Sequence, residues 1–222
     1  MGQKPLIIFG AGELAEVAAY YFDNDSCRRI EAFTIDGNQI SETVFLDRPV
    51  EAFETIAETY PPEIYDLFVA VGYSRVNALR MEKCELARTK GYELVSYVSP
   101  NAYVANNVDI GWNCLVLEDN TIQPFVHIGN GVTLWSGNHI GHHAQIGDYA
   151  FISSHVVISG GVKVGEQTFI GVNATTTDHI AIGARCVIGA GSLIAKDVPD
   201  ECVIVAKPAK LSTVPSHRLR HF

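Results

Sequence analysis

Residues 134–158, LWSGNHIGHHAQIGDYAFISSHVVI, place an aliphatic side chain at every sixth position. The same spacing runs from Val104 to Ile194, where fifteen of sixteen positions are aliphatic and Thr176 is the exception. Glycine directly follows the aliphatic residue in eight of these repeats. A period of six fits neither an α-helix nor a simple alternating strand, and a short fixed period is typical of solenoids.

A triangular prism accounts for this period. Each hexapeptide forms one flat face with its aliphatic residue directed to the axis, so three faces complete a coil of about 18 residues. Coils stack at the strand spacing of roughly 4.8 Å, and each buried aliphatic side chain contributes roughly 1.5–3 kcal/mol. We expect the glycines to relax the backbone at the corners and Thr176 to lie in a bulge or loop.

The first hundred residues follow a different pattern, in which short apolar runs alternate with segments of helical spacing. Strands are predicted at 5–9, 30–35, 67–71 and 93–97, and helices at 14–21, 50–59 and 77–90. This alternation predicts a small parallel sheet with right-handed crossovers. The chain therefore divides into an α/β domain over residues 1–100 and a repeat domain over residues 101–222.

The repeat, from residue 104 to about residue 198, resembles the hexapeptide-repeat acyltransferases, whose fold is a left-handed parallel β-helix. With the α/β domain in front, the whole chain is similar to bacterial sugar acetyltransferases grouped with the sialic acid O-acetyltransferases. The resemblance implies a cytoplasmic homotrimer with its active site between adjacent β-helices and acetyl-CoA as donor. It implies N-acetylation of a nucleotide-linked amino sugar for a surface glycan such as lipopolysaccharide or capsule. Sugar O-acetylation needs the same base and donor and is the near alternative.

Four of the eight histidines lie between residues 139 and 155, and the six-residue lattice directs all four outward. The resemblance implies that His142 is the general base for the attacking amine, and imidazole suits this role because it titrates near neutral pH. His143 stands where the family often has Asp or Glu. Which of the two rings is the base, and what orients it, therefore stays open, and a surface or trimer contact is the alternative for both.

Zinc chemistry is another alternative, since proteins resembling the γ-class carbonic anhydrases bind zinc through three histidines at a subunit interface. His139, His142, His143 and His155 have suitable side chains. The run IGHHAQIGD fits the transferases better, so we expect no metal. A non-catalytic glycan-binding or scaffold trimer is the third class of function.

A glycine turn is the main feature of the α/β domain. Gly10 and Gly12 follow the first strand and open a helix, and Asp36 ends the next strand, which is typical of nucleotide-binding domains. The resemblance implies that these residues and Glu13 hold the nucleotide of the sugar substrate. Many relatives have glycine in place of Glu13, and a carboxylate there repels a pyrophosphate, which puts its contact in doubt. A purely structural turn is the alternative.

The resemblance implies two further groups of binding residues. The turn after the third strand contacts the nucleotide sugar through Gly72, Tyr73 and Arg75. The pantetheine of CoA lies in a groove where small residues permit close approach, and the residues implied along it are His155, Gly160, Asn173, Ala190 and Gly191. Lys207 is placed near the CoA phosphates, although a lysine near a C-terminus is more often only solvated.

Composition limits the remaining possibilities. The chain has 222 residues, 47% of them hydrophobic, and a net charge of −9, which disfavours a nucleic-acid partner. Its apolar runs are too short for a signal peptide or a membrane span, so we expect no membrane insertion. The five cysteines are scattered, as is typical of reduced cytoplasmic thiols.

Overall fold

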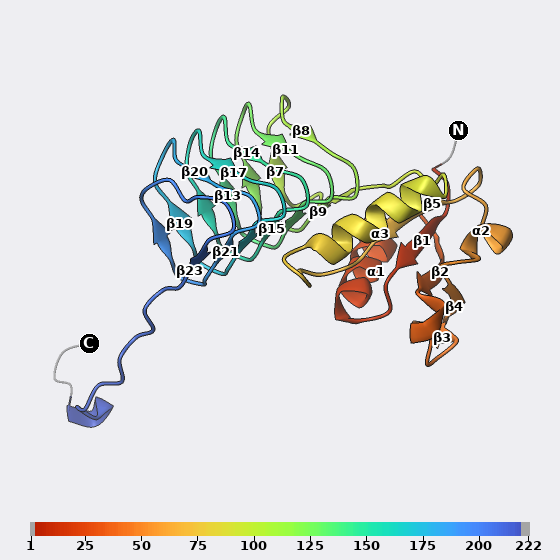
Figure 1. Cartoon of the computed structure of the whole chain (residues 1–222), viewed down its shortest axis with the longest axis horizontal. Coiled ribbons are helices and arrows are strands. Elements are labelled where there is room, and N and C mark those ends of the chain that lie inside the picture. Colours follow the sequence, from red (N-terminus) through yellow and green to blue (C-terminus); the bar gives the residue numbers. More distant parts are fainter. Residues whose placement is uncertain (1–2, 219–222) are drawn as a thin grey trace.

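The structure, a computed structural model, describes residues 3–218, and the outermost residues of both predicted domains fall outside this range. An α/β domain, here called the front domain, is followed by a β-helix of three parallel sheets, and an extended C-terminal segment leaves its far end (Figure 1). No helix of residues 3–218 has the length and apolar character needed to cross a bilayer.

The front domain contains one sheet of five strands in the order β3-β4-β2-β1-β5. Its elements in chain order are β1 (Leu6–Phe9), α1 (Glu13–Asp25), β2 (Ile30–Ile35), a 3₁₀ turn (Gly37–Gln39), β3 (Val44–Phe45), β4 (Arg48–Ala52), α2 (Ile56–Thr59), β5 (Asp66–Val69) and α3 (Ala78–Thr89). Strands β4, β2, β1 and β5 are parallel, but β3 is antiparallel to β4. The sheet is therefore mixed, and the prediction of a wholly parallel sheet is wrong at this edge. Leu46 and Asp47 both have left-handed backbone angles (φ 49° and 59°) and make the two-residue turn of this hairpin.

The helix predicted at 50–59 is wrong in its first half. Val50 belongs to β4 and pairs with Phe33 of β2, and only the last four residues are helical. Val50, Phe53 and Ile56 recur at helical spacing, but pairing with β2 buries Val50 in the sheet and prevails over the local pattern.

The strand predicted at 93–97 is also wrong as a sheet strand of the front domain. Leu94 makes a single bridge to Leu67, and Tyr97 begins the first strand of the β-helix, where it pairs with Leu115.

Three sheets form the sides of the β-helix, and their strands are two residues long. Sheet I contains β6 (Tyr97–Val98), β9 (Leu115–Val116), β12 (Thr133–Leu134), β15 (Phe151–Ile152), β18 (Phe169–Ile170), β21 (Val187–Ile188) and β23 (Val203–Ile204). Sheet II contains β7 (Tyr103–Val104), β10 (Thr121–Ile122), β13 (His139–Ile140), β16 (Val157–Ile158), β19 (Thr175–Thr176) and β22 (Leu193–Ile194). Sheet III contains β8 (Asp109–Ile110), β11 (His127–Ile128), β14 (Gln145–Ile146), β17 (Lys163–Val164) and β20 (Ala181–Ile182). A short 3₁₀ turn (Ser216–Arg218) lies in the C-terminal segment.

The six-residue lattice forms the core of the β-helix, as predicted. Ile122 pairs with Ile140 one coil further on, and both side chains are fully buried, like the other central members of the lattice. Thr176 occupies an inward position in β19 and is 3% exposed, so the predicted bulge or loop is wrong. Its hydroxyl accepts a hydrogen bond from the Ser159 amide (2.9 Å), which satisfies the one polar side chain of the lattice.

The glycines of the repeat serve the stacking of coils. A Cβ on Gly141 would lie 2.7 Å from the Gly160 amide of the next coil, so only glycine fits there. The left-handed backbone lies two residues further on, at positions such as His143 (φ 60°) and His155 (φ 57°). The expectation that the glycine itself makes the corner is therefore corrected: the corner residue is the third after the aliphatic.

Arg80 of α3 joins the front domain to the β-helix and is 1% exposed. Its guanidinium donates to the carbonyls of Gly72 (3.1 Å) in the front domain and of Gly131 (2.9 Å) and Tyr149 (2.6 Å) in the coils. Burial lowers the pKa of Arg80 to about 10, so the side chain stays charged at neutral pH. Because it bonds to carbonyls of both parts, Arg80 holds the segment after β5 against the β-helix.

Candidate active site

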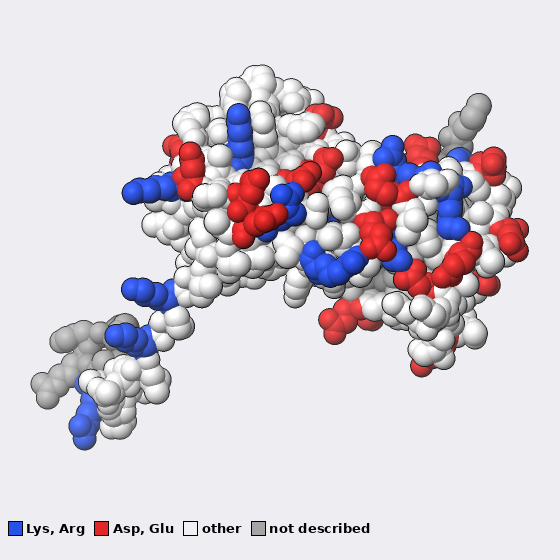
Figure 2. All heavy atoms as spheres, in the orientation of Figure 1, with Lys and Arg blue, Asp and Glu red and all other residues white. Residues whose placement is uncertain are grey.

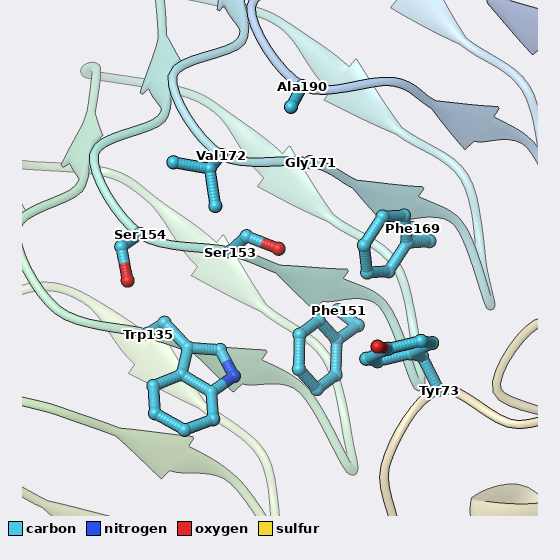
Figure 3. A pocket seen from close by; sticks show the side chains of 9 residues that line it. All are labelled: Tyr73, Trp135, Phe151, Ser153, Ser154, Phe169, Gly171, Val172 and Ala190. Carbon is cyan, nitrogen blue, oxygen red and sulfur yellow. The ribbon is translucent and has the colours of Figure 1, made fainter.

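An aromatic cavity of about 380 Å³ opens where the front domain meets the outer side of sheet I. Its lining residues are Tyr73, Trp135, Phe151, Ser153, Ser154, Phe169, Gly171, Val172 and Ala190. Tyr73 approaches from the front domain, with its ring 5.2 Å from that of Phe151 and 4.9 Å from that of Phe169 (Figure 3). A largely apolar lining with a few hydroxyls, here those of Tyr73, Ser153 and Ser154, is typical of ligand sites.

The resemblance places Tyr73 at the nucleotide sugar and Ala190 at CoA, and the structure brings these two residues into one cavity. Trp135, Phe151 and Phe169 also line it and are not among the residues expected from the sequence. Phe151 and Phe169 both precede an inward aliphatic of sheet I, in register with each other, so their outward stacking was readable from the lattice. The contact of Phe151 and Phe169 with Tyr73 could not be predicted from the lattice, because it depends on how the front domain packs against the β-helix.

Tyr73 stands at the start of an unusual turn. Three consecutive residues, Arg75, Val76 and Asn77, have left-handed φ angles of 53°, 50° and 66°, a conformation that costs roughly 1–2 kcal/mol for each non-glycine residue. Asn77 is fully buried and donates to the Gln167 carbonyl (2.6 Å), which holds the turn against the coils. Arg75 is exposed and pairs with Glu82 of α3.

A second cavity, of about 330 Å³, lies at the carboxyl ends of β1 and β2. It brings together Gly10, Gly12 and Asp36, as predicted for a nucleotide site, and adds Lys83 of α3. The Lys83 ammonium lies 2.6 Å from a carboxylate oxygen of Asp36. Lys83 is not among the residues expected from the sequence, because only the packing of α3 beside the sheet brings it to this edge.

The glycine turn itself depends on its residue types. Gly10 has φ 132°, and a Cβ there would lie 2.8 Å from the Ala70 carbonyl oxygen, so glycine is required by the fold. A Cβ on Gly12 would meet nothing within 4 Å, which leaves the N-terminus of α1 open to an anion. Glu13 is exposed and does not line the cavity, and this relieves the repulsion expected from its carboxylate.

His142 and His143 lie at the corner between sheets II and III, and both are exposed. Their Nδ1 atoms are 3.1 Å apart. The His142 ring lies over Gly160, and a Cβ on Gly160 would lie 2.7 Å from Cε1 of this ring. Within one chain, the missing side chain of Gly160 therefore leaves space for the His142 ring and not for CoA. The His143 ring stacks on Phe125 at 4.7 Å between centroids.

The remaining donor-site residues lie at the corner between sheets I and II. His155, Asn173 and Gly191 occupy successive coils there, each with a left-handed φ. They are sequence neighbours of cavity-lining residues, but sheet II separates them from His142, so His155 does not share a cleft with His142 within one chain. Lys207 is exposed on the C-terminal segment, on which Figure 2 shows basic side chains and no acidic ones.

The outer face of sheet II differs from that of sheet III. Its outward residues are Tyr103, Thr121, His139, Val157, Thr175 and Leu193, of which none is Asp, Glu, Lys or Arg. Tyr103 is 63% and Leu193 71% exposed. Sheet III, by contrast, presents Asp109 and Lys163. The described residues contain no group of three or more His, Cys, Asp or Glu arranged as metal ligands.

Comparisons with known proteins agree with this architecture. Residues 125–160 match the family described as bacterial transferase hexapeptide (six repeats). No curated protein matches the chain in sequence.

Solved structures match over nearly the whole chain. One is a His-to-Asn variant of perosamine N-acetyltransferase from Caulobacter crescentus in complex with CoA and GDP-perosamine. It has 26% identity and a TM-score of 0.83, with 95% of this chain and 97% of that chain covered. Another is the acetyltransferase domain of PglB from Neisseria gonorrhoeae FA1090 in complex with acetyl coenzyme A (25% identity, TM-score 0.80, 94% and 99% covered). WeeI from Acinetobacter baumannii AYE shares the fold (20% identity, TM-score 0.79, 93% and 98% covered).

In its repeat and in its architecture, this chain resembles the hexapeptide-repeat transferases. Within this class, the structures that it resembles along its length include acetyltransferases that combine a front α/β domain with the β-helix.

Proposed function

We propose that this protein transfers the acetyl group of acetyl-CoA to the amine of a nucleotide-linked amino sugar, in the cytoplasm, for a surface glycan. The main support is the match over 95% of the chain to an N-acetyltransferase solved with CoA and GDP-perosamine. The two cavities are consistent with it, because the front domain opens one at its glycine turn and closes the other with Tyr73. In this proposal residues 1–100 bind the nucleotide sugar and residues 101–222 form the transferase domain.

The site is completed between copies of the chain, in a homotrimer of left-handed β-helices. His142 and the aromatic cavity lie at opposite edges of sheet II, so one chain alone does not bring them together. Sheet II has the uncharged outer face, with Tyr103 and Leu193 largely exposed, that suits burial against a second copy. We place the His142 corner of one copy beside the aromatic cavity of the next.

His142 acts as the general base. The amine nitrogen of the sugar attacks the thioester carbonyl carbon, and Nε2 of His142 takes the proton that the nitrogen loses. The new C–N bond replaces the C–S bond, and the CoA thiolate leaves and receives that proton from the imidazolium. Water is kept from the thioester by the aromatic walls of the cavity, among them Phe151 and Phe169.

The two substrates occupy different ends of this site. The nucleotide lies at Gly10 and Gly12 with its phosphates near Lys83, and Asp36 meets the ribose or base. The pantetheine of CoA runs past Asn173, Ala190 and Gly191, where small side chains permit close approach. Lys207 meets the CoA phosphates, and the extended basic segment that holds it agrees with this role.

The decisive assay measures release of CoA with a panel of nucleotide-linked amino sugars and their hydroxyl counterparts. We expect turnover with the amines, and His142→Ala lowers kcat by roughly 10²–10⁴ while the Kd of acetyl-CoA changes little. His179→Ala is the control, because His179 is an exposed histidine at the same corner between sheets II and III, two coils further on. Turnover only of hydroxyl sugars identifies an O-acetyltransferase, and stoichiometric zinc in the purified protein contradicts the proposal.

A further inference from the structure

We infer that His143 orients His142 and takes the place of a carboxylate in this active site. The inference rests on the proposed function, in which His142 is the base. The observation is the 3.1 Å separation of the two Nδ1 atoms, a hydrogen-bond distance between the atoms through which one imidazole can direct another.

The distance restricts the tautomers of the pair. Two neutral rings bonded through Nδ1 share a single hydrogen, so one Nδ1 donates and the other accepts. When His142 is the donor, its Nε2 has no hydrogen and presents a lone pair, as a general base must. His143 then has its hydrogen on Nε2 and accepts with Nδ1. Without such a partner His142 distributes between two tautomers, only one of which leaves Nε2 free.

The His143 ring is itself held in place. Its backbone is left-handed (φ 60°), and its amide donates to the Pro124 carbonyl at 3.2 Å. Its ring stacks on Phe125 of the preceding coil, with 28° between the planes. The His142 amide donates to the Gln123 side chain (2.9 Å), which fixes the start of the pair. Contacts with the preceding coil therefore position both residues, and the corner itself brings their two rings within hydrogen-bond distance.

Within residues 3–218, neither ring of the pair has a hydrogen bond or ion pair with a carboxylate. Among the described residues, the only hydrogen bond or ion pair between a histidine ring and a carboxylate is that of His127 with Asp109, on sheet III. Orientation of His142 therefore falls to the neutral imidazole of His143. A neutral acceptor stabilises the imidazolium formed during transfer less than a carboxylate does, since hydrogen bonds to ionised groups are roughly twice as strong.

The test compares two replacements of His143 in the full-length protein. His143→Phe keeps an aromatic ring to stack on Phe125 but removes the acceptor. A phenylalanine is tolerated in this backbone conformation, as Phe125 itself shows (φ 66°). His143→Glu restores an acceptor of the kind that the position often has in the family. His179→Phe changes the equivalent corner residue two coils away (φ 58°) and controls for loss of a surface histidine.

We expect His143→Phe to lower kcat at least about tenfold, because a misdirected tautomer removes the base. The KM for acetyl-CoA and the melting temperature stay near those of the parent. His143→Glu keeps kcat within about threefold of the parent or raises it, and His179→Phe leaves it unchanged. Recovery of kcat in His143→Glu distinguishes an orienting role from a merely structural one, because a glutamate supplies the acceptor but cannot stack on Phe125 as an aromatic ring does.

Two outcomes overturn the inference. His143→Phe with parental kcat shows that no orienting group is needed, and loss of activity in both His143 variants shows that His143 is itself the base. Neither outcome decides whether the protein transfers acetyl groups to amino sugars, because release of CoA with the parent protein tests that separately. An inactive His142→Ala beside a fully active His143→Phe leaves acetyl transfer in place and removes only the orienting role.

Discussion

Replacement of Arg80 by methionine tests whether one buried cation holds the two parts of the chain together. Arg80 donates to six acceptors, five of them backbone carbonyls. Methionine fills similar space but donates to none of these acceptors, and the buried carbonyls of Gly131 and Tyr149 are among those that lose a donor. Hydrogen bonds are lost in both parts of the joint between the front domain and the β-helix, since the acceptors include the carbonyls of Gly72 in the front domain and of Tyr149 in the β-helix.

The magnitude follows from the shortest of these contacts. The bonds to the Tyr149 carbonyl (2.6 Å), the Gly131 carbonyl (2.9 Å) and the Asn77 side chain (3.0 Å) each contribute about 1.5–3 kcal/mol. Burying the guanidinium opposes this sum by several kcal/mol. We therefore expect Arg80→Met to lower the free energy of unfolding by about 3–5 kcal/mol, since each buried acceptor left without a donor costs about 1–3 kcal/mol.

Urea unfolding followed by circular dichroism measures this change. Arg80→Lys keeps the charge but has a single nitrogen that cannot reach both parts, so its midpoint falls between those of the parent and Arg80→Met. Arg185→Met is the control, because Arg185 is a surface arginine paired with Glu166 and Glu201, and such pairs contribute little. If Arg80→Met unfolds at the same urea concentration as Arg185→Met, the joint does not depend on Arg80.

Two further predictions concern the nucleotide cavity and the response to alkali. Lys83→Met removes the ammonium beside the glycine turn, so we expect the Kd of a panel of nucleoside diphosphates to rise about tenfold, near 1.4 kcal/mol, in calorimetric titration, while the Kd of acetyl-CoA stays constant. Lys83→Arg keeps the positive charge and restores binding. If the Kd of the nucleoside diphosphates is unchanged in Lys83→Met, Lys83 is not part of the nucleotide site. Burial and a hydrogen bond to Glu118 raise the pKa of Tyr21 to about 12 from its usual 10. Because the unfolded tyrosine releases its proton first, stability present below pH 10 is lost as the pH rises towards 12. Tyr21→Phe flattens this loss in thermal melts from pH 9 to 12, and an equal slope in both proteins refutes the contribution of Tyr21.

The candidate site was predicted unevenly from the sequence. The outward direction of His142 and the cluster of Gly10, Gly12 and Asp36 followed from the lattice and from strand ends, and the structure agrees with both placements. Their catalytic and binding roles stay predictions. Lys83 was missed because it lies 47 positions from Asp36 and reaches it only through the packing of α3.

The errors at Val50 and Thr176 have one common cause, which is that the contact that decides each conformation comes from a residue far away in the sequence. Val50, Phe53 and Ile56 suit one face of a helix, yet Val50 pairs with Phe33 because β2 offers a partner edge. Thr176 breaks the aliphatic pattern, yet it stays in the ladder because Ser159 of the preceding coil supplies a hydrogen bond. Neither partner is local, so no window of sequence contains the deciding contact.

The sequence by itself determined the three-sided β-helix, because a period of six repeated across more than ninety residues buries every aliphatic and pairs every strand when the chain coils in this way. It also determined which side chains face outward, since each position within the hexapeptide has a constant direction. Tertiary structure alone decided which outward groups meet: Tyr73 with Phe151 and Phe169, Lys83 with Asp36, and Arg80 with the coils. These meetings depend on the angle at which two separately patterned parts pack, and that angle is set by contacts between residues far apart in the chain.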